Sequence, residues 1–377
     1  MLAAPENRTK VLLVGPKPPA RGGVAQFIAN CCKATSDFDF EVFDTGRLIL
    51  DGSSGRMAKG YGDALEAGMS VAFQKLFSTL KHLCHYPFFL RKAKPSIVQI
   101  QFSLNWSFWE NAFYLMVARL LGLKTIIRLG SSNMESFFAE SKKMSFHLKR
   151  KVLNSADRVI VQSRYWHRFF SRMIPEERLV IIGNAVSIAP VLQERRQDGR
   201  IHVLFEGGKD ALRKGAFDVL AAAEILRGEG CQRCQFHCMA ATPEIAQKVD
   251  ALHLRDSVDL HLYMSGKEKE EIFAQCHVFL LPSYSEGFPH SLLEAMSFGH
   301  AVIATPVGAV PEIVTEGNNG YIIRPGDVKA LAIALKCLSG DHQKMADMGR
   351  KNYELVSGHF SIDMLGQKLS ALYARVQ

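Results

Sequence analysis

Two glutamates eight positions apart, Glu286 and Glu294, have the types and spacing in this chain that most suggest chemistry. Glu286 follows an apolar run typical of a buried strand, and Glu294 lies in a helical pattern behind it. Paired carboxylates can act as general acid and base, but sequence spacing does not show that they flank one bond. They also accept bidentate hydrogen bonds from the vicinal hydroxyls of a ribose or hexose. With Ser283 and Ser285 in the same loop, the pair indicates a site for a hydroxyl-rich molecule.

A second group of residues lies in the segment 206–215, between a predicted strand and a predicted helix. Its cations Lys209, Arg213 and Lys214 surround a glycine turn. Cations and exposed backbone N–H groups at such a turn suit a diphosphate. A solvated loop remains the alternative.

A weaker motif, Arg21-Gly22-Gly23, follows the first predicted strand and precedes a helical pattern at 24–30. Glycines at a strand-to-helix turn let backbone approach a ligand, and a helix N-terminus favours an anion. The motif is neither G-x-G-x-x-G nor a P-loop, so an ordinary glycine turn explains it equally well.

Two further patterns have structural explanations beside functional ones. Cys231, Cys234, Cys238 and His237 lack the second ligand pair of a zinc site, and we expect them to be structural. The basic, aromatic stretch 73–94 suits an anionic membrane surface or a nucleic acid, or it is a helix with one apolar and one solvated basic face.

Composition limits the class of protein. The chain has 377 residues, 47% of them hydrophobic and 22% charged, which predicts a folded protein of two domains. Its eight cysteines follow no disulfide framework, the N-terminus shows no secretory signal, and no apolar run is long enough to span a bilayer, so we expect a cytoplasmic protein.

The net charge of +9 is unevenly distributed. Residues 1–180 contain 26 Lys and Arg against 14 Asp and Glu, whereas residues 181–377 contain 20 against 23. The basic half therefore predicts an acidic partner, such as nucleic acid, anionic lipid or a phosphate-bearing substrate.

Short apolar runs alternate with helical patterns along the whole chain, the signature of doubly wound parallel sheets. The polar stretch 187–200 interrupts the alternation and is typical of a linker. We therefore predict two Rossmann-like α/β domains. A final helix at 362–376 is expected after a break at Ser357-Gly358-His359.

The segment 280–327 closely resembles the donor-binding region of retaining glycosyltransferases of family 4, also called glycosyl transferases group 1. Other matching segments occur in the family's order: Arg21-Gly22-Gly23, residues 156–163, residues 183–186, and Arg213-Lys214-Gly215. The resemblance implies a GT-B fold, with two Rossmann-like domains facing a cleft and a C-terminal helix crossing back to the first. It assigns residues 1–187 and 359–377 to an acceptor-binding domain and residues 188–358 to a nucleotide-sugar donor domain.

By this resemblance the chain is a retaining, metal-independent hexosyltransferase that needs no cofactor. Glu286 and Lys214 take catalytic roles, at the donor sugar and at the diphosphate leaving group. Glu294 binds the ribose hydroxyls. The donor-binding set is completed by Gly22, Gly23, Lys209, Arg213, Gly287, Phe288 and Pro289.

The expected partners are a UDP- or GDP-sugar and a glycan or lipid-linked acceptor in polysaccharide or lipopolysaccharide biosynthesis. Because the first half is basic, we also expect an anionic membrane surface, at the inner face of the membrane, as a partner. Nucleic acid is not expected as a partner.

Two departures from the family pattern keep alternatives open. Leu129 stands where a histidine is common, with Arg128 beside it on the other side of the predicted strand, and Gly208 stands where an arginine is common. The Leu129 departure is compatible with activity, and whether Lys209 substitutes for the arginine that is common at position 208 stays open. The two departures also leave open a weakened, nucleotide-sugar-binding homologue, and the same cleft would suit a nucleotide-sugar hydrolase or epimerase.

Overall fold

The computed structural model describes residues 8–20, 22–34, 37–46, 69–189, 198–208, 210–231 and 233–377, with backbone only for 69–76. Contacts divide the chain into two compact units. Unit 1 comprises Met1–Asn184 and Ile362–Gln377, and unit 2 comprises Ala185–Ser361. The sequence had placed these boundaries at 187/188 and 358/359. Arg21 and Lys209 lie outside the described residues.

Unit 1 is built on a parallel six-stranded sheet with the order β2-β1-β3-β4-β5-β6. Its strands are β1 (Thr9–Gly15), β2 (Phe38–Asp44), β3 (Ile97–Phe102), β4 (Lys124–Leu129), β5 (Arg158–Val161) and β6 (Leu179–Ile181). The predicted β–α alternation is thereby confirmed for this half. The inner strands β3 and β4 are almost fully buried because helices cover both faces of the sheet, as parallel sheets require.

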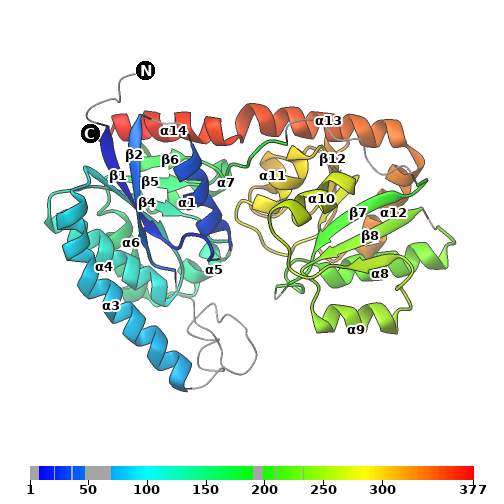
Figure 1. Ribbon diagram of the computed structural model, residues 1–377, viewed down its shortest axis with the longest axis horizontal. Helices are drawn as coiled ribbons and strands as arrows, with labels where there is room; N and C mark the ends of the chain where they lie inside the picture. The colour runs from blue at the N-terminus through cyan, green and yellow to red at the C-terminus, as the bar shows by residue number, and fades with distance from the viewer. Residues whose placement is uncertain are drawn as a thin grey trace. The chain divides into compact units, whose positions relative to one another are not determined.

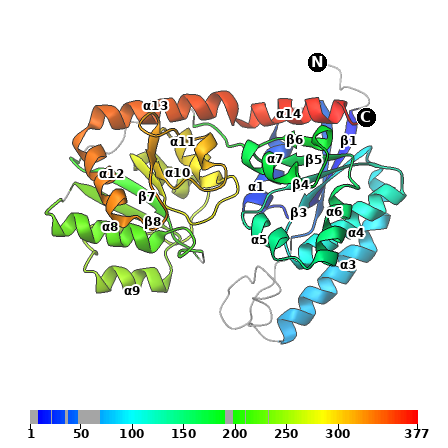
Figure 2. The ribbon, with the colours of Figure 1, turned by 180° about the vertical axis from the view of Figure 1, so that it is seen from behind.

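The helices of unit 1 form two layers (Figures 1 and 2). One core of buried residues joins one face of the sheet to α3, α4, α6 and α7. On the other face α1 packs against the C-terminal helix α14, where Tyr373 donates a hydrogen bond of 2.8 Å to Gln99. The helices are α1 (Gly23–Lys33), α3 (Met69–Ala93), α4 (Trp106–Leu120), α5 (Met134–Ala139), α6 (Lys143–Leu153), α7 (Arg164–Phe170), the short 3-10 helix η1 (Glu176–Arg178) and α14 (Ile362–Ala374).

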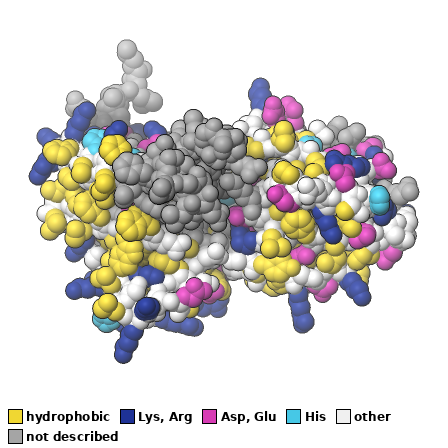
Figure 3. Space-filling model, turned by 90° about the horizontal axis from the view of Figure 1, so that it is seen from below, with side chains coloured by type: hydrophobic (Ala, Val, Ile, Leu, Met, Phe, Trp, Pro, Cys, Tyr) yellow, Lys and Arg dark blue, Asp and Glu magenta, His cyan; other side chains and the backbone are white. Residues whose placement is uncertain are grey.

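The outer surface of unit 1 carries large hydrophobic side chains beside lysines and arginines, on the face shown at the left of Figure 3. Among the described residues, no helix is both long enough and apolar enough to cross a membrane.

Unit 2 repeats the design with a parallel sheet of order β12-β11-β10-β7-β8-β9. Its strands are β7 (Ile201–Glu206), β8 (Cys234–Met239), β9 (Val258–Leu260), β10 (Val278–Leu281), β11 (Ala301–Ala304) and β12 (Gly320–Ile322). Its helices are α8 (Ala216–Gly228), α9 (Pro243–Ala251), α10 (Lys267–Gln275), α11 (His290–Ser297), the 3-10 helix η2 (Val310–Glu312), α12 (Val328–Gly340) and α13 (His342–His359).

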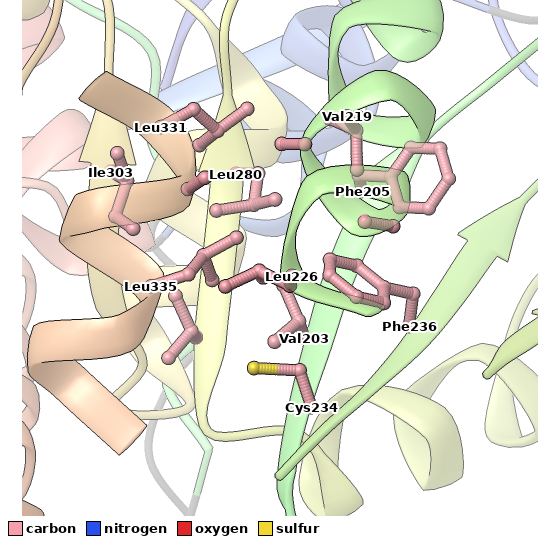
Figure 4. Packing of buried hydrophobic residues seen from close by; sticks show 14 of the residues in the cluster. Val203, Phe205, Val219, Leu226, Cys234, Phe236, Leu280, Ile303, Leu331 and Leu335 are labelled. Atoms are coloured by element: carbon pink, nitrogen blue, oxygen red, sulfur yellow. The ribbon is translucent and has the colours of Figure 1, made fainter. Parts of the chain in front are cut away.

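Alternate residues of neighbouring strands form the core of unit 2. Val203, Leu280 and Ile303 project from β7, β10 and β11 toward Leu226 of α8 and Leu335 of α12, and all five are almost fully buried (Figure 4). This packing fixes the sheet, and with it the positions of the loops that follow each strand.

One predicted helix boundary was wrong. We expected a break at Ser357-Gly358-His359, but α13 continues to His359, and α14 begins at Ile362 after Phe360 and Ser361. A single glycine is tolerated near a helix end when packing supports the helix, and Val356 is fully buried there.

Candidate functional site

The candidate site of unit 2 lies at the carboxyl ends of β7 and β10. These adjacent strands mark the switch point of the sheet, because the chain leaves β7 toward β8 on one side and β10 lies on the other. Ligands of open parallel sheets bind outside the strand ends at such a point. β7 ends at Glu206, and β10 is followed by the loop that contains Glu286.

A glycine-rich turn links β7 to α8 and packs closely against the ends of β8 and β10. The N–H of Gly207 donates to the carbonyl of Met239, the last residue of β8, at 2.8 Å. Gly215, just before α8, has a φ of 70°, and a Cβ there would lie 2.3 Å from the carbonyl oxygen of Pro282. Only glycine suits this position, because other residues would meet both strain and a clash. The turn thereby brings Arg213 and Lys214 against the loop that follows β10.

The Lys214 ammonium forms an ion pair with the carboxylate of Glu206. Burial raises the pKa of Glu206, but the charges of Lys214 and Lys269 outweigh burial and hold this pKa below its ordinary value. The pKa of Lys214 is raised, because Glu206 and Glu286 outweigh the opposing effect of burial. Lys214 is therefore a firmly protonated cation at the sheet edge. Glu206 was not predicted as a site residue, although its place at the end of a buried strand was a usable signal.

Glu286 is held by the loop in which it lies. The Ser283 hydroxyl donates to its carboxylate at 2.9 Å, and an Arg213 Nη1 lies 3.5 Å from the same oxygen and 2.5 Å from the carbonyl of Ser285. Its side chain is only 12% exposed. Burial raises the pKa of Glu286, although Lys214 and Arg213 act in the opposite direction.

Residues 287–289 continue the loop into α11. Gly308 has a φ of 56°, and a Cβ there would lie 2.1 Å from the Glu286 carbonyl oxygen, so the two loops are in close contact. The Ala309 N–H donates to the Gly287 carbonyl at 3.0 Å. The Phe288 side chain is 7% exposed and belongs to the core, and Pro289 caps α11. Any ligand contact by these residues would therefore come from backbone or from the prolyl ring.

Glu294 lies on α11, one turn and a half into the helix, and its carboxylate is 2.6 Å from the Lys269 ammonium of α10. Burial raises the pKa of Glu294, and Lys269 partly opposes this shift. The charge of Glu206 also raises the Glu294 pKa, so the two carboxylates are electrostatically coupled. Lys269 was missed, because the run Lys267–Glu271 is typical of a solvated helix face.

The structure thus brings together four predicted site residues of unit 2: Arg213, Lys214, Glu286 and Glu294. Gly22 and Gly23 belong to unit 1, where Gly22 precedes α1 with a φ of 117°. Among the described residues, no side chain caps α1, and added Cβ atoms at the two glycines would meet no described atom within 4 Å. Lys209, which was predicted to bind the donor, lies outside the described residues.

The departure at Leu129 is accommodated as packing. Leu129 is 3% exposed and belongs to the core under α3 and α4. Arg128 points to the other face, as predicted, with its guanidinium 3.6 Å from the centre of the Phe27 ring and 2.7 Å from Asn184 Oδ1. Burial lowers the pKa of Arg128 to about 10. Neither side chain is exposed on the surface of unit 1.

The cysteine motif is part of the core of unit 2. Burial raises the pKa values of Cys234 and Cys238 to about 12, so both are thiols. His237 forms a row with His202 and His261, with ring nitrogens 2.8 Å and 3.1 Å apart. The described part of the chain contains no cluster of three or more His, Cys, Asp or Glu side chains suited to a metal ion.

Residues 195–355 match the family model "Glycosyl transferases group 1". The match falls almost wholly in unit 2. The N-acetyl-alpha-D-glucosaminyl L-malate synthase of Bacillus anthracis is 30% identical over 150 residues, which cover 40% of this chain and 36% of that protein. The capsular polysaccharide biosynthesis glycosyltransferase CapM of Staphylococcus aureus is 21% identical over 79% of this chain and 81% of its own. The match thus spans little more than a third of the former relative and most of the latter.

Solved structures match over nearly the whole chain. The sucrose-phosphate synthase of Thermosynechococcus elongatus has a TM-score of 0.74 at 18% identity, covering 98% of this chain and 99% of that one. Anabaena Alr3699/HepE in complex with UDP has a TM-score of 0.70 at 15% identity, covering 97% and 100%. These likenesses confirm the predicted GT-B fold, a two-domain α/β architecture.

Proposed function

We propose that the protein is a retaining glycosyltransferase that moves a hexose-type sugar from a nucleotide-sugar to an acceptor hydroxyl. One observation carries the proposal: the edge of unit 2 at β7 and β10 gathers Lys214, Glu286 and Glu294 within a glycosyl transferases group 1 domain. A cation for a leaving diphosphate and two carboxylates for sugar hydroxyls are the groups that this reaction needs.

Lys214 is the residue for the leaving group. A diphosphate would compete with Glu206 for its ammonium, and because the pKa of Lys214 is raised, the side chain stays charged throughout the neutral range. Arg213 is 28% exposed and lies beside it, so it supplies a second cation. Fixed cations stabilise charge that develops as the bond from sugar C1 to phosphate oxygen breaks, and no metal ion is needed for that role.

Glu294 and Glu286 divide the remaining polar contacts of the donor. Glu294 would accept hydrogen bonds from the ribose hydroxyls, exchanging its contact with Lys269. Glu286, with Ser283 behind it, would accept hydrogen bonds from the sugar. In the retaining reaction the acceptor oxygen bonds to C1 on the face that the diphosphate leaves, and the acceptor proton passes to the leaving phosphate oxygen.

UDP- and GDP-sugars are the proposed donors, and a glycan or lipid-linked glycan is the proposed acceptor. The complexes of HepE with UDP and with UDP-glucose favour a uridine nucleotide. The names of relatives and neighbours in capsular, colanic acid and lipopolysaccharide assembly favour polysaccharide biosynthesis. A place at the cytoplasmic face of a membrane is part of our proposal.

A second candidate is a nucleotide-sugar-binding homologue without transferase activity. Leu129 favours it, because a buried leucine cannot hydrogen-bond the donor where the family often has histidine. A nucleotide-sugar hydrolase or epimerase using the same residues is the third.

Product analysis separates the three candidates. The chain is incubated with UDP-glucose, UDP-N-acetylglucosamine or GDP-mannose, with and without a polyprenyl-diphosphate-linked monosaccharide, and the products are followed by proton NMR. We expect nucleoside diphosphate release that depends on the acceptor, and a new anomeric signal with the donor's configuration. Free sugar or an isomer without acceptor would support the third candidate, and donor binding without turnover the second. An inverted product would contradict retention.

A further inference from the structure

The outer surface of the helices α3, α4 and α6 exposes several large hydrophobic side chains to solvent. These helices cover one face of the unit 1 sheet, since their buried residues belong to one core, and α3 packs directly on α4. Large hydrophobic side chains on their solvent side are half exposed or more. They are Phe77 at 65%, Leu80 at 51% and Phe88 at 66% on α3, Met116 at 53% and Leu120 at 78% on α4, and Met144 at 85% and Leu148 at 50% on α6.

The same helices are strongly basic. Residues 69–94 and 142–151 together contain ten Lys and Arg and no Asp or Glu. On α3, Lys81, Arg91 and Lys92 are exposed beside the hydrophobic residues. On α6, Lys143 and Lys151 are exposed near Met144. In Figure 3 the hydrophobic side chains of unit 1 gather on one face, with lysine and arginine side chains among and around them.

We propose that this surface, the outer side of α3, α4 and α6, docks the protein on an anionic phospholipid bilayer. Lysines and arginines near a membrane are attracted by acidic headgroups, while apolar side chains between them enter the boundary with the acyl chains. The surface is suited to lying on the bilayer rather than crossing it, because cations interrupt α3 throughout its length.

The apolar component favours a bilayer over a nucleic acid. Five of the seven side chains given above are aliphatic or thioether groups, which offer neither hydrogen bonds to phosphates nor planar rings for stacking on bases: Leu80, Met116, Leu120, Met144 and Leu148. Of the seven, Phe77 and Phe88 carry rings that could stack. Nucleic-acid surfaces gain their affinity from cations and stacking, and exposed leucines and methionines add little to either. A bilayer, by contrast, interacts favourably with both the cations and the apolar side chains.

This inference goes beyond the sequence-based expectation of membrane binding, which rested on the basic first half and on residues 73–94 with Trp106 and Trp109 beyond them. The structure adds the exposed residues Met116 and Leu120 of α4 and the exposed face of α6, which lies about 50 residues beyond that stretch in a separate helical pattern. It does not depend on the proposed transfer reaction, because the residues involved are all in unit 1 and none belongs to the donor site.

Vesicle flotation with the full chain tests the proposal. Vesicles of phosphatidylcholine alone are compared with vesicles containing phosphatidylglycerol, at low and at high salt. We expect binding to the phosphatidylglycerol vesicles that weakens roughly tenfold or more at high salt, since salt screens exposed charges. Equal binding to both vesicle types, or no binding at low salt, would overturn the proposal. Retention on single-stranded RNA without vesicle binding would overturn it in favour of a nucleic acid.

Matched variants locate the surface. Leu120→Ser with Phe88→Ser removes apolar groups from unit 1, and Leu262→Ser with Ile333→Ser removes groups of similar exposure, 79% and 63%, from unit 2. The first pair should reduce the vesicle partition coefficient roughly tenfold, and the second should leave it unchanged. Equal effects would overturn the assignment. Donor binding by unit 2 is measured on each variant, so that a loss of folding or of the donor site is distinguished from a loss of docking.

Discussion

The two units are both built on a parallel six-stranded sheet covered by helices, but they place their charges differently. At the carboxyl edge of unit 2, Glu206, Lys214, Glu286 and Glu294 are partly buried, paired and coupled. The carboxyl edge of unit 1 carries amides, the partly exposed Asp44, which accepts backbone N–H groups, and the buried guanidinium of Arg128, whose described partners include no carboxylate. Many exposed cations of unit 1 lie instead on the outer faces of α3 and α6. The same scaffold therefore serves two purposes: titratable groups at strand ends suit small-molecule chemistry, and charges on helix surfaces suit a large anionic partner.

The largest effect is expected at Lys214. Replacing it with alanine removes the cation for the leaving group and leaves Glu206 without its ion pair. Turnover should fall about 100- to 1,000-fold, because fixed cations at the leaving group stabilise the transition state. Steady-state release of nucleoside diphosphate measures this.

The control for that experiment is Lys329→Ala, at an exposed position on α12 of the same unit. It should have the activity of the parent chain. If Lys214→Ala retained more than about a third of the activity, the assigned role of Lys214 would be wrong.

Glu286→Gln should separate function from stability. The pKa of Glu286 is raised mainly by burial, so the folded state holds the proton more tightly than the unfolded state does. The group therefore contributes stability fully below its ordinary pKa, and this contribution is lost as pH rises through the folded value. At pH 8 the ionised, buried carboxylate disfavours folding, and the neutral amide should raise the melting temperature by about 2–4 °C.

The same variant should lower turnover, because an amide accepts weaker hydrogen bonds from sugar hydroxyls than a carboxylate does. Thermal unfolding from pH 4 to pH 8 shows the sign of the stability effect, with Glu354→Gln on α13 as the exposed control. A stability gain that grew toward pH 4 would contradict the stated cause of the shift.

The smallest effect is expected for Arg128→Met. The Arg128 guanidinium is buried without a carboxylate partner in the described chain, so the charge itself adds little stability. Arg128→Met keeps the contact with Phe27 and should change the free energy of unfolding by no more than about 1 kcal/mol. Arg128→Ala also leaves a cavity and should cost about 2–4 kcal/mol.

Chemical denaturation of the two variants measures the difference. If both variants lost the same free energy of unfolding, the charge of Arg128, rather than its packing, would be what stabilises this edge of unit 1. Donor binding should be unchanged in Arg128→Met, which sharpens the contrast between the two sheets.

Much of the fold could be predicted because buried parallel strands are short and mostly apolar, as at 97–102, or wholly apolar, as at 278–281. The strand β2 was missed, because Asp39 and Glu41 interrupt it and it is an edge strand with one half-exposed face, although its alternation was a signal. The three-residue β6 is too short for any periodicity to be visible. The helix α13 was missed because it is largely polar outside its buried stripe.

The site was predictable where residues share a loop or a strand end. Lys214 and Glu286 follow adjacent strands of one parallel sheet, and that topology brings them together. Lys269 could not be predicted, because its contact with Glu294 depends on how α10 packs beside α11. Sequence patterns specify which residues end a strand, but contacts between two helices depend on the packed core.

The central claim is that the β7 and β10 edge of unit 2 binds a nucleotide-sugar, and ligand-detected NMR tests it most directly. A panel of UDP-, GDP-, ADP- and TDP-sugars is screened against the full chain, against Glu294→Ala and against the exposed control Glu354→Ala. We predict selective binding of one nucleotide class, with a dissociation constant that rises roughly 10- to 100-fold in Glu294→Ala and stays unchanged in Glu354→Ala. Failure of the parent chain to bind any member, or equal binding by Glu294→Ala, would contradict the account.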